Sequence, residues 1–211
     1  MIHKNATDLP ELPAAAFAKS DATPDTDFYA PPRLVAHIDD AAIAALTDFY
    51  REVLPEGGAV LDLCSSWISH LPPEVAYREV VGHGMNADEL SANPRLTRWW
   101  VQDLNADPAL PLPDAELDAV TICVSVQYLQ RPVEVMRELR RALRPGSPVV
   151  ISFSNRCFPT KAVAIWGALD EAGHAALVRM YLERAGFSDV EAYRLRDGRR
   201  SDPLVAVVGR A

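Results

Sequence analysis

Residues 131–155 read RPVEVMRELRRALRPGSPVVISFSN, the most specific signal of a helix, a turn and a strand in this chain. Its first half predicts an amphipathic helix over 133–143, because apolar residues recur on one face and charged residues on the other. The pair Pro145–Gly146 ends that helix, and VVISF at 149–153 follows as an apolar, β-branched run typical of a buried strand. A helix that leads through a tight turn into a buried strand is a unit of parallel sheets, so we expect an α/β protein.

Similar elements lie on both sides of this stretch. AVLDL at 59–63 follows the pair Gly57–Gly58, and LDAVTICV at 117–124 is rich in β-branched residues, so both predict buried strands. Weaker strands are predicted over 78–81 and 96–101. The other predicted elements are helices over 38–53, 73–76, 87–92, 161–169 and 171–185, and strands over 190–195 and 204–208.

The last two strands are joined by a short turn that contains Asp197–Gly198, so they must run antiparallel. We therefore expect one α/β domain, a Rossmann-like parallel sheet with crossover helices and a C-terminal antiparallel β-hairpin. Residues 39–211 form this domain. Residues 1–38, which contain several prolines, are expected to form an N-terminal arm or lid.

Composition narrows the class of protein. A formal net charge of −8 argues against nucleic acid as the main partner, and no apolar run approaches the length of a membrane span. The three cysteines are few and odd in number, and the N-terminus lacks the pattern of a signal peptide. We expect a cytoplasmic protein that binds a small molecule. His37, His70, His83 and the cysteines have no paired ligand spacing, so no metal is expected.

The order of these parts resembles the class I S-adenosylmethionine-dependent methyltransferases, especially the type 11 group. Four stretches carry the resemblance: AVLDL with the loop behind it, VQDLNADPALPLPDAELDAVTICVSVQYL, the quoted stretch 131–155, and ERAGFSDVEAYRL. It implies the seven-stranded methyltransferase fold and S-adenosyl-L-methionine as the cofactor.

The resemblance also implies a cofactor site at the carboxyl edge of the sheet, where ligands of open α/β sheets bind. The loop after the first strand would hold the methionine part, the residues after the second strand the ribose, and those after the third strand the adenine. Asp103 would accept the adenine amino group. The residues implied are Asp62, Cys64, Ser65 and Trp67; Gly84, Met85 and Asn86; Gln102, Asp103 and Leu104; and Ser125 at the sulfonium end.

Two departures from the family pattern stand out. The first loop, LCSSWISH at 63–70, contains no glycine, although close backbone approach to a cofactor usually requires one. No acidic residue directly follows the second strand, and Asn86 is the one neutral substitute that could bond the ribose hydroxyls.

Polar residues on three segments are candidates for the acceptor side of the site. Tyr29, Arg33 and His37 lie on the arm, Gln127 follows the fourth strand, and Arg156 follows the fifth. We interpret all five as catalytic or substrate-binding residues. His70 and His83 are ranked as structural histidines ahead of catalytic bases, and Lys161 is expected to face solvent at the first turn of a helix.

These features predict a methyltransferase that acts on a small molecule, because little chain remains to build a cap domain. The lack of an evident strong base favours a small thiol, whose thiolate a nearby cation would stabilise. O- or N-methylation of a small metabolite stays open, as does a non-catalytic protein of this fold with weak cofactor binding. A dehydrogenase is disfavoured because the Gly-x-Gly-x-x-Gly pattern is missing.

Overall fold

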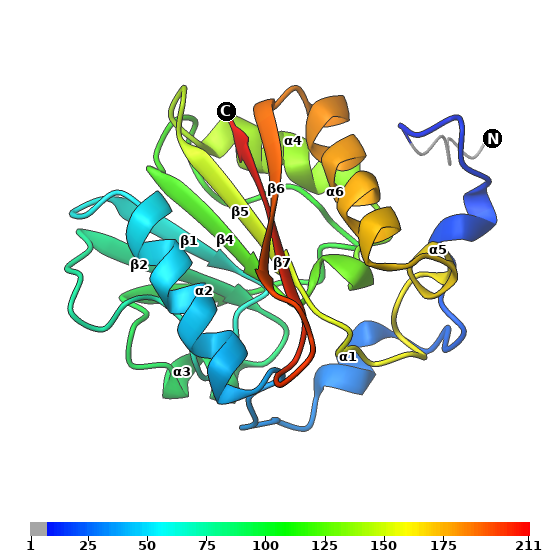
Figure 1. Ribbon diagram of the computed structural model, residues 1–211, viewed down its shortest axis with the longest axis horizontal. Helices are drawn as coiled ribbons and strands as arrows, with labels where there is room; N and C mark the ends of the chain where they lie inside the picture. The colour runs from blue at the N-terminus through cyan, green and yellow to red at the C-terminus, as the bar shows by residue number, and fades with distance from the viewer. Residues whose placement is uncertain (1–7) are drawn as a thin grey trace.

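A computed structural model describes residues 8–211 and contains one seven-stranded mixed sheet (Figure 1). The strand order is β3-β2-β1-β4-β5-β7-β6. The first five strands run parallel, and β7 is antiparallel to both β5 and β6. This confirms the predicted α/β class and the C-terminal antiparallel hairpin. The strands are β1 Ala59–Leu63, β2 Glu79–Gly84, β3 Arg98–Val101, β4 Ala119–Cys123, β5 Pro148–Phe153, β6 Ser188–Arg196 and β7 Leu204–Arg210.

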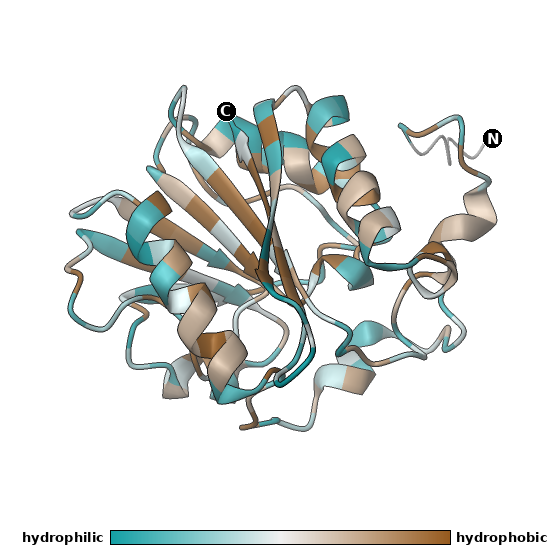
Figure 2. Ribbon diagram, viewed as in Figure 1, coloured by the Kyte–Doolittle hydropathy of each residue, from teal (hydrophilic) through white to brown (hydrophobic). Residues whose placement is uncertain are grey.

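Helices cover both faces of the sheet and give it two apolar cores (Figure 2). The larger core lies between the sheet and helices α4 and α6, and the smaller one lies between the sheet and α2. Every residue of β1 and β5 is buried, as expected for central strands covered on both faces. The helices are η1 Ala14–Phe17, α1 Asp25–Tyr29, α2 Asp40–Val53, α3 Ala87–Ala92, η2 Val126–Tyr128, α4 Pro132–Ala142, α5 Ala164–Ala168 and α6 Glu171–Ala185.

Local signals explain where the long helices begin and end. Asp39 accepts a hydrogen bond from the Ala42 amide and caps α2, and Asp170 caps α6 in the same way. Gly186, with φ of 91°, ends α6 in the left-handed conformation that glycine favours. The stretch at 73–76 is a turn and not the predicted helix.

The arm before α2 packs against the segment that follows β5. The Asp21 amide donates to the Thr160 carbonyl at 2.9 Å, and the Ala164 amide donates to the Ala18 carbonyl at 2.8 Å. Lys161 lies between these two contacts with no exposed surface, so the expectation that it faces solvent is wrong. Its ammonium group donates to the Thr23 carbonyl at 2.6 Å and pairs with Asp25 at 3.4 Å.

Within residues 8–211, no helix is long and apolar enough to cross a membrane.

Candidate functional site

A cavity of about 570 Å³ lies at the carboxyl edge of the sheet, where β1, β2 and β4 end and the arm crosses in front of them. This edge is where open α/β sheets bind their ligands, because the strand order reverses between β1 and β4. Predicted site residues that line the cavity are Tyr29, His37, Cys64, Ser65, Gly84, Met85, Asn86, Gln102, Asp103, Leu104, Ser125 and Arg156. Asp62, Trp67, Arg33 and Gln127 do not line it.

Asp62 lies beneath the loop that follows β1 and organises it. Its carboxylate accepts hydrogen bonds from the hydroxyls of Ser65 at 2.6 Å, Ser69 at 2.5 Å and Thr121 at 3.2 Å. Burial raises the pKa of Asp62, and these three hydroxyls oppose the shift. The Asp62 carboxylate thus bonds protein hydroxyls and does not line the cavity. This corrects the expectation that it faces a cofactor directly.

The glycine-free loop after β1 packs closely against β2, and the glycine at that contact belongs to β2. Cys64 adopts φ of 56°, the left-handed conformation that the missing glycine would have taken. Opposite it, a Cβ on Gly84 would lie 2.6 Å from the Ser65 carbonyl oxygen, so no larger residue fits there. The requirement for glycine is therefore met from β2 and not from the loop itself.

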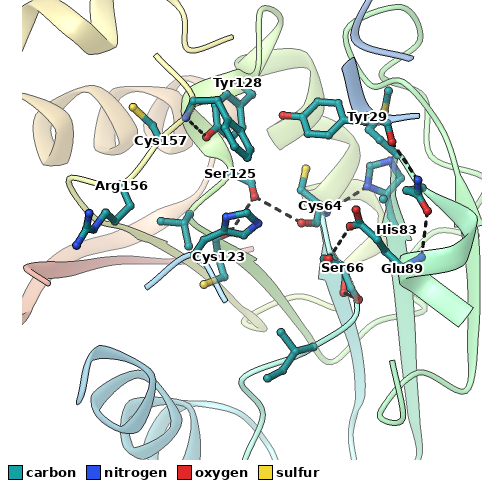
Figure 3. A pocket seen from close by; sticks show the side chains of 18 of the residues that line it. Tyr29, Cys64, Ser66, His83, Glu89, Cys123, Ser125, Tyr128, Arg156 and Cys157 are labelled. Atoms are coloured by element: carbon teal, nitrogen blue, oxygen red, sulfur yellow. Dashed lines mark hydrogen bonds between the residues drawn. The ribbon is translucent and has the colours of Figure 1, made fainter. Parts of the chain in front are cut away.

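His83 ties the same loop to the ends of β2 and β3. Its Nδ1 accepts from the Cys64 amide at 3.2 Å, and its Nε2 bonds the Gln102 carbonyl at 3.0 Å, so Nε2 carries the proton (Figure 3). Burial lowers the pKa of His83 to about 4. The imidazole is neutral and fully engaged, which fits the structural role ranked first for it.

Asn86 and Glu89 connect the end of β2 to the arm. Asn86 caps α3 through the Glu89 amide, and its side-chain amide donates to the carbonyls of Tyr29 at 3.0 Å and Ala30 at 2.9 Å. Glu89 lines the cavity, and its carboxylate accepts from the Ser66 hydroxyl at 2.5 Å and the Arg33 amide at 2.7 Å. The sequence analysis missed Glu89. Its position one turn into the helix after β2 was the available signal.

The residues after β3 shape the far end of the cavity. The Gln102 side chain donates to the carbonyls of Asp107 and Ala109, both at 2.8 Å, so its amide is held away from a ligand. Asp103 lines the cavity, and its Oδ1 accepts from the Asn105 amide at 2.9 Å, which fixes the carboxylate at the edge of the sheet.

At the end of β4 the chain turns sharply into η2. Val124 has φ of 45°, an uncommon conformation for a β-branched residue, and Ser125 donates to the Cys123 carbonyl at 2.8 Å. Gln127 has no exposed surface and donates to the Val124 carbonyl at 2.8 Å, so it supports the turn from behind. This corrects its assignment as a residue that faces a substrate.

Two further predicted residues hold the arm without lining the cavity. The Trp67 indole donates to the Val35 carbonyl at 3.1 Å. The Arg33 guanidinium donates to the Phe28 carbonyl at 2.8 Å and lies 4.5 Å from the centre of the Phe28 ring. Arg156 does line the mouth, where it pairs with Asp202 at 2.8 Å.

Comparisons with known proteins agree with this arrangement. Residues 64–151 match a family model described as a methyltransferase domain. No curated protein matches the chain in sequence.

Solved structures of methyltransferases have the same fold. A chain from the complex between the Haloferax volcanii Trm112 methyltransferase activator and a methyltransferase is 17% identical, with a TM-score of 0.63 over 82% of this chain and 90% of that chain. A SAM-dependent methyltransferase from Archaeoglobus fulgidus is 16% identical, with a TM-score of 0.60 over 80% and 93%. Phosphoethanolamine N-methyltransferase 2 from Haemonchus contortus, in complex with S-adenosyl-L-methionine, is 12% identical, with a TM-score of 0.57 over 79% and 52%.

Proposed function

The chain has the class I methyltransferase fold, with a methyltransferase-domain match over residues 64–151, and on this basis we propose that it transfers a methyl group from S-adenosyl-L-methionine to a small molecule. The observation that carries the proposal is the cavity at the carboxyl edge, where the ends of β1, β2 and β4 meet. Its lining combines carboxylates with apolar side chains, a combination that suits a nucleoside with a sulfonium group.

The residues present fit this cofactor. Cys64, Ser65 and Gly84 line the cavity where the loop after β1 meets the end of β2, and the methionine part would lie against them. Glu89 carries a carboxylate suited to the ribose hydroxyls, a role that the sequence had given to Asn86. Asp103 remains our candidate for the adenine amino group. When bound, the cofactor supplies an electrophilic methyl group on sulfur.

The arm would form the acceptor side of this site. Tyr29 and His37 line the cavity from the arm, and Cys157 and Phe158 line it from the loop after β5. An acceptor between these segments would be shielded from water and held close to the methyl group, which is the main requirement for an in-line methyl transfer. As part of this proposal, residues 1–38 stay the arm or lid and 39–211 the catalytic domain, with Leu9 and Phe17 of the arm packed into the larger core of that domain.

The small thiol favoured from the sequence has weaker support from the geometry. That preference rested on cations near the acceptor, namely Arg33, His37 and Arg156. Arg33 lies outside the cavity lining, and Arg156 is paired with Asp202. Burial lowers the pKa of His37, so its imidazole is neutral near pH 7. An acceptor that reacts without a stabilising cation, with oxygen, nitrogen or sulfur as its nucleophile, therefore fits at least as well.

Turnover tests the proposal directly. We expect the full chain to convert S-adenosyl-L-methionine to S-adenosylhomocysteine when supplied with small thiols, phenols, carboxylic acids and amines in separate reactions. The loss of product in the Glu89→Gln variant, but not in the Glu52→Gln variant, would assign the activity to this cavity, because Glu52 lies on α2 outside its lining. Absence of product with every class of acceptor would contradict methyl transfer.

A non-catalytic role is the second candidate, and one observation favours it. Asn86 and Glu89, at the end of β2, already bond the arm, so a cofactor would compete with the arm for them. Binding of S-adenosylhomocysteine without turnover in any acceptor class would support this alternative.

A further inference from the structure

The acceptor end of the cavity has an aromatic wall formed by Tyr29, His37, Tyr128 and Phe158, all of which line it. Phe158 is its centre. The ring of His37 lies edge-on to it at 5.5 Å, that of Tyr29 edge-on at 6.5 Å, and that of Tyr128 is stacked on it at 6.0 Å. The arm, η2 and the loop after β5 each contribute to the wall, and Figure 3 labels two of its members, Tyr29 and Tyr128.

The wall is uncharged near neutral pH. Burial lowers the pKa of His37, so its imidazole is neutral. Burial also raises the pKa of Tyr128 to about 12 and that of Tyr29 further, so both hydroxyls keep their protons. Tyr128 already accepts from the Phe158 amide at 2.8 Å, which fixes its ring.

Charged groups near the wall are paired with protein groups. Asp25 accepts from the Asn105 side chain at 3.0 Å and pairs with the buried Lys161 at 3.4 Å. At the mouth, Arg156 pairs with Asp202 at 2.8 Å, and the Asp202 amide donates to the Asp39 carboxylate at 2.6 Å. A charged ligand on the wall would have to break one of these pairs or remain without a counter-ion. The cost is larger at the buried Lys161–Asp25 pair than at Arg156, whose side chain is 61% exposed.

Arg33 further disfavours a cation. Aromatic faces attract ammonium groups, but the Arg33 guanidinium already lies 4.5 Å from the Phe28 ring centre and 5.5 Å from that of Phe158. A second positive charge on the cavity side of Phe158 would be repelled by it. Asp25, Asp39 and Asp202 all line the cavity, and although protein groups already bond their carboxylates, the three oxygen-bearing groups still disfavour an anion beside them.

We propose that the molecule bound at the acceptor end is uncharged and aromatic, and that its ring packs on the wall centred on Phe158. This inference rests on the proposed function for the identity of the acceptor, and it narrows that function to one class of substrate. Offset and edge-to-face packing on Phe158 would recognise a planar ring, and the neutral wall would select against charged substituents.

Three one-ring probes of nearly equal shape test the inference: benzyl alcohol, benzoate and benzylammonium. Binding to the full chain saturated with S-adenosylhomocysteine is measured by calorimetry or by ligand-observed NMR. We expect benzyl alcohol to bind about tenfold or more tightly than either charged probe, and more tightly than cyclohexylmethanol, which has no π-face. Equal or tighter binding of a charged probe, or no binding of benzyl alcohol while S-adenosylhomocysteine binds, would overturn the inference. Failure of S-adenosylhomocysteine itself to bind would instead overturn the proposed function.

Two variants separate the parts of the argument. Arg33→Met removes the charge beside the wall, so the affinity for benzylammonium relative to that for benzyl alcohol should rise several-fold. Phe158→Leu should weaken benzyl alcohol at least fivefold, whereas Tyr193→Leu, which removes a partly exposed ring from β6, should not. An unchanged ratio of these two affinities in Arg33→Met would contradict the charge argument even if Phe158→Leu does not fold.

Discussion

Cys64 and Gly84 explain at the residue scale how a loop without glycine makes a ligand-binding turn. The positive φ of Cys64 is strained for a residue with a Cβ, and the hydrogen bond from its amide to His83 helps to hold it. The steric requirement for glycine falls on Gly84, which faces the Ser65 carbonyl. The sequence shows that the loop has no glycine, but it does not show that Gly84 takes over the role. The loop and Gly84 meet only after β1 and β2 pair.

Because Gly84 takes the place of a loop glycine, substitutions at Gly84 and at Cys64 should change stability in different ways. Gly84→Ala should lower the free energy of unfolding by about 1–3 kcal/mol, because the added methyl group overlaps the Ser65 carbonyl oxygen. Cys64→Gly should leave stability unchanged or raise it, because it relieves the strained φ. Urea denaturation measures both, with Gly167→Ala as a control that meets no atom within 4 Å. A stable Gly84→Ala variant would show that the loop adjusts freely.

Asp103 gives a second prediction at this scale. Asp103→Asn keeps an oxygen for the Asn105 amide but removes the charge, so S-adenosylhomocysteine should bind more weakly by about 1–3 kcal/mol. Asp107→Asn is the matched control, because Asp107 lies on the same loop outside the cavity lining. Calorimetry compares the two variants, and equal affinities would put the adenine elsewhere.

The arm is the element that the sequence described least well. Its prolines predicted an irregular segment, but Leu9 and Phe17 are buried in the larger core, so its first part is built into the domain. Lys161 pairs with groups almost 140 residues earlier in the chain, and no local pattern reveals such partners. By contrast, α6 was predicted with its observed ends, because Asp170 and Gly186 are local caps.

Removal of the Lys161 charge should loosen the arm. Lys161→Met leaves the mostly buried Asp25 with one cationic partner fewer, and we expect the free energy of unfolding to fall by about 3 kcal/mol. Arg179→Met breaks an exposed pair with Glu183 on α6 and should cost less than about 1 kcal/mol. Denaturant titrations with limited proteolysis of the arm would check this. Equal effects of the two substitutions would contradict the anchoring role of Lys161.

At the scale of the whole molecule, the stability of the fold varies with pH because two buried histidines at the site stay neutral. Burial lowers the pKa of both His70 and His83 to about 4, whereas an unfolded chain titrates near 6.5. The unfolded state therefore takes up protons between pH 6.5 and 4 that the folded state does not. Each histidine contributes stability that is complete above pH 6.5 and is lost as the pH falls toward 4.

The free energy of unfolding should consequently decrease on acidification through this window, by roughly 3 kcal/mol for each imidazole. In the His83→Gln variant and in the His70→Gln variant, the slope of the free energy of unfolding against pH should decrease by the equivalent of about one proton. Asp62, whose raised pKa acts in the opposite sense, is common to all three proteins and cancels in the comparison. Identical slopes in the wild type and both variants would contradict the neutral state of these histidines.

The central claim is that the cavity at the carboxyl edge of the sheet binds the methyl-donor cofactor. Calorimetric titration of the full chain with S-adenosylhomocysteine measures this binding, with Asp103→Asn as the variant that removes a charge from the cavity lining. We predict saturable binding at one site, weakened in Asp103→Asn. No binding by the folded wild-type protein at concentrations up to about 1 mM would contradict the claim.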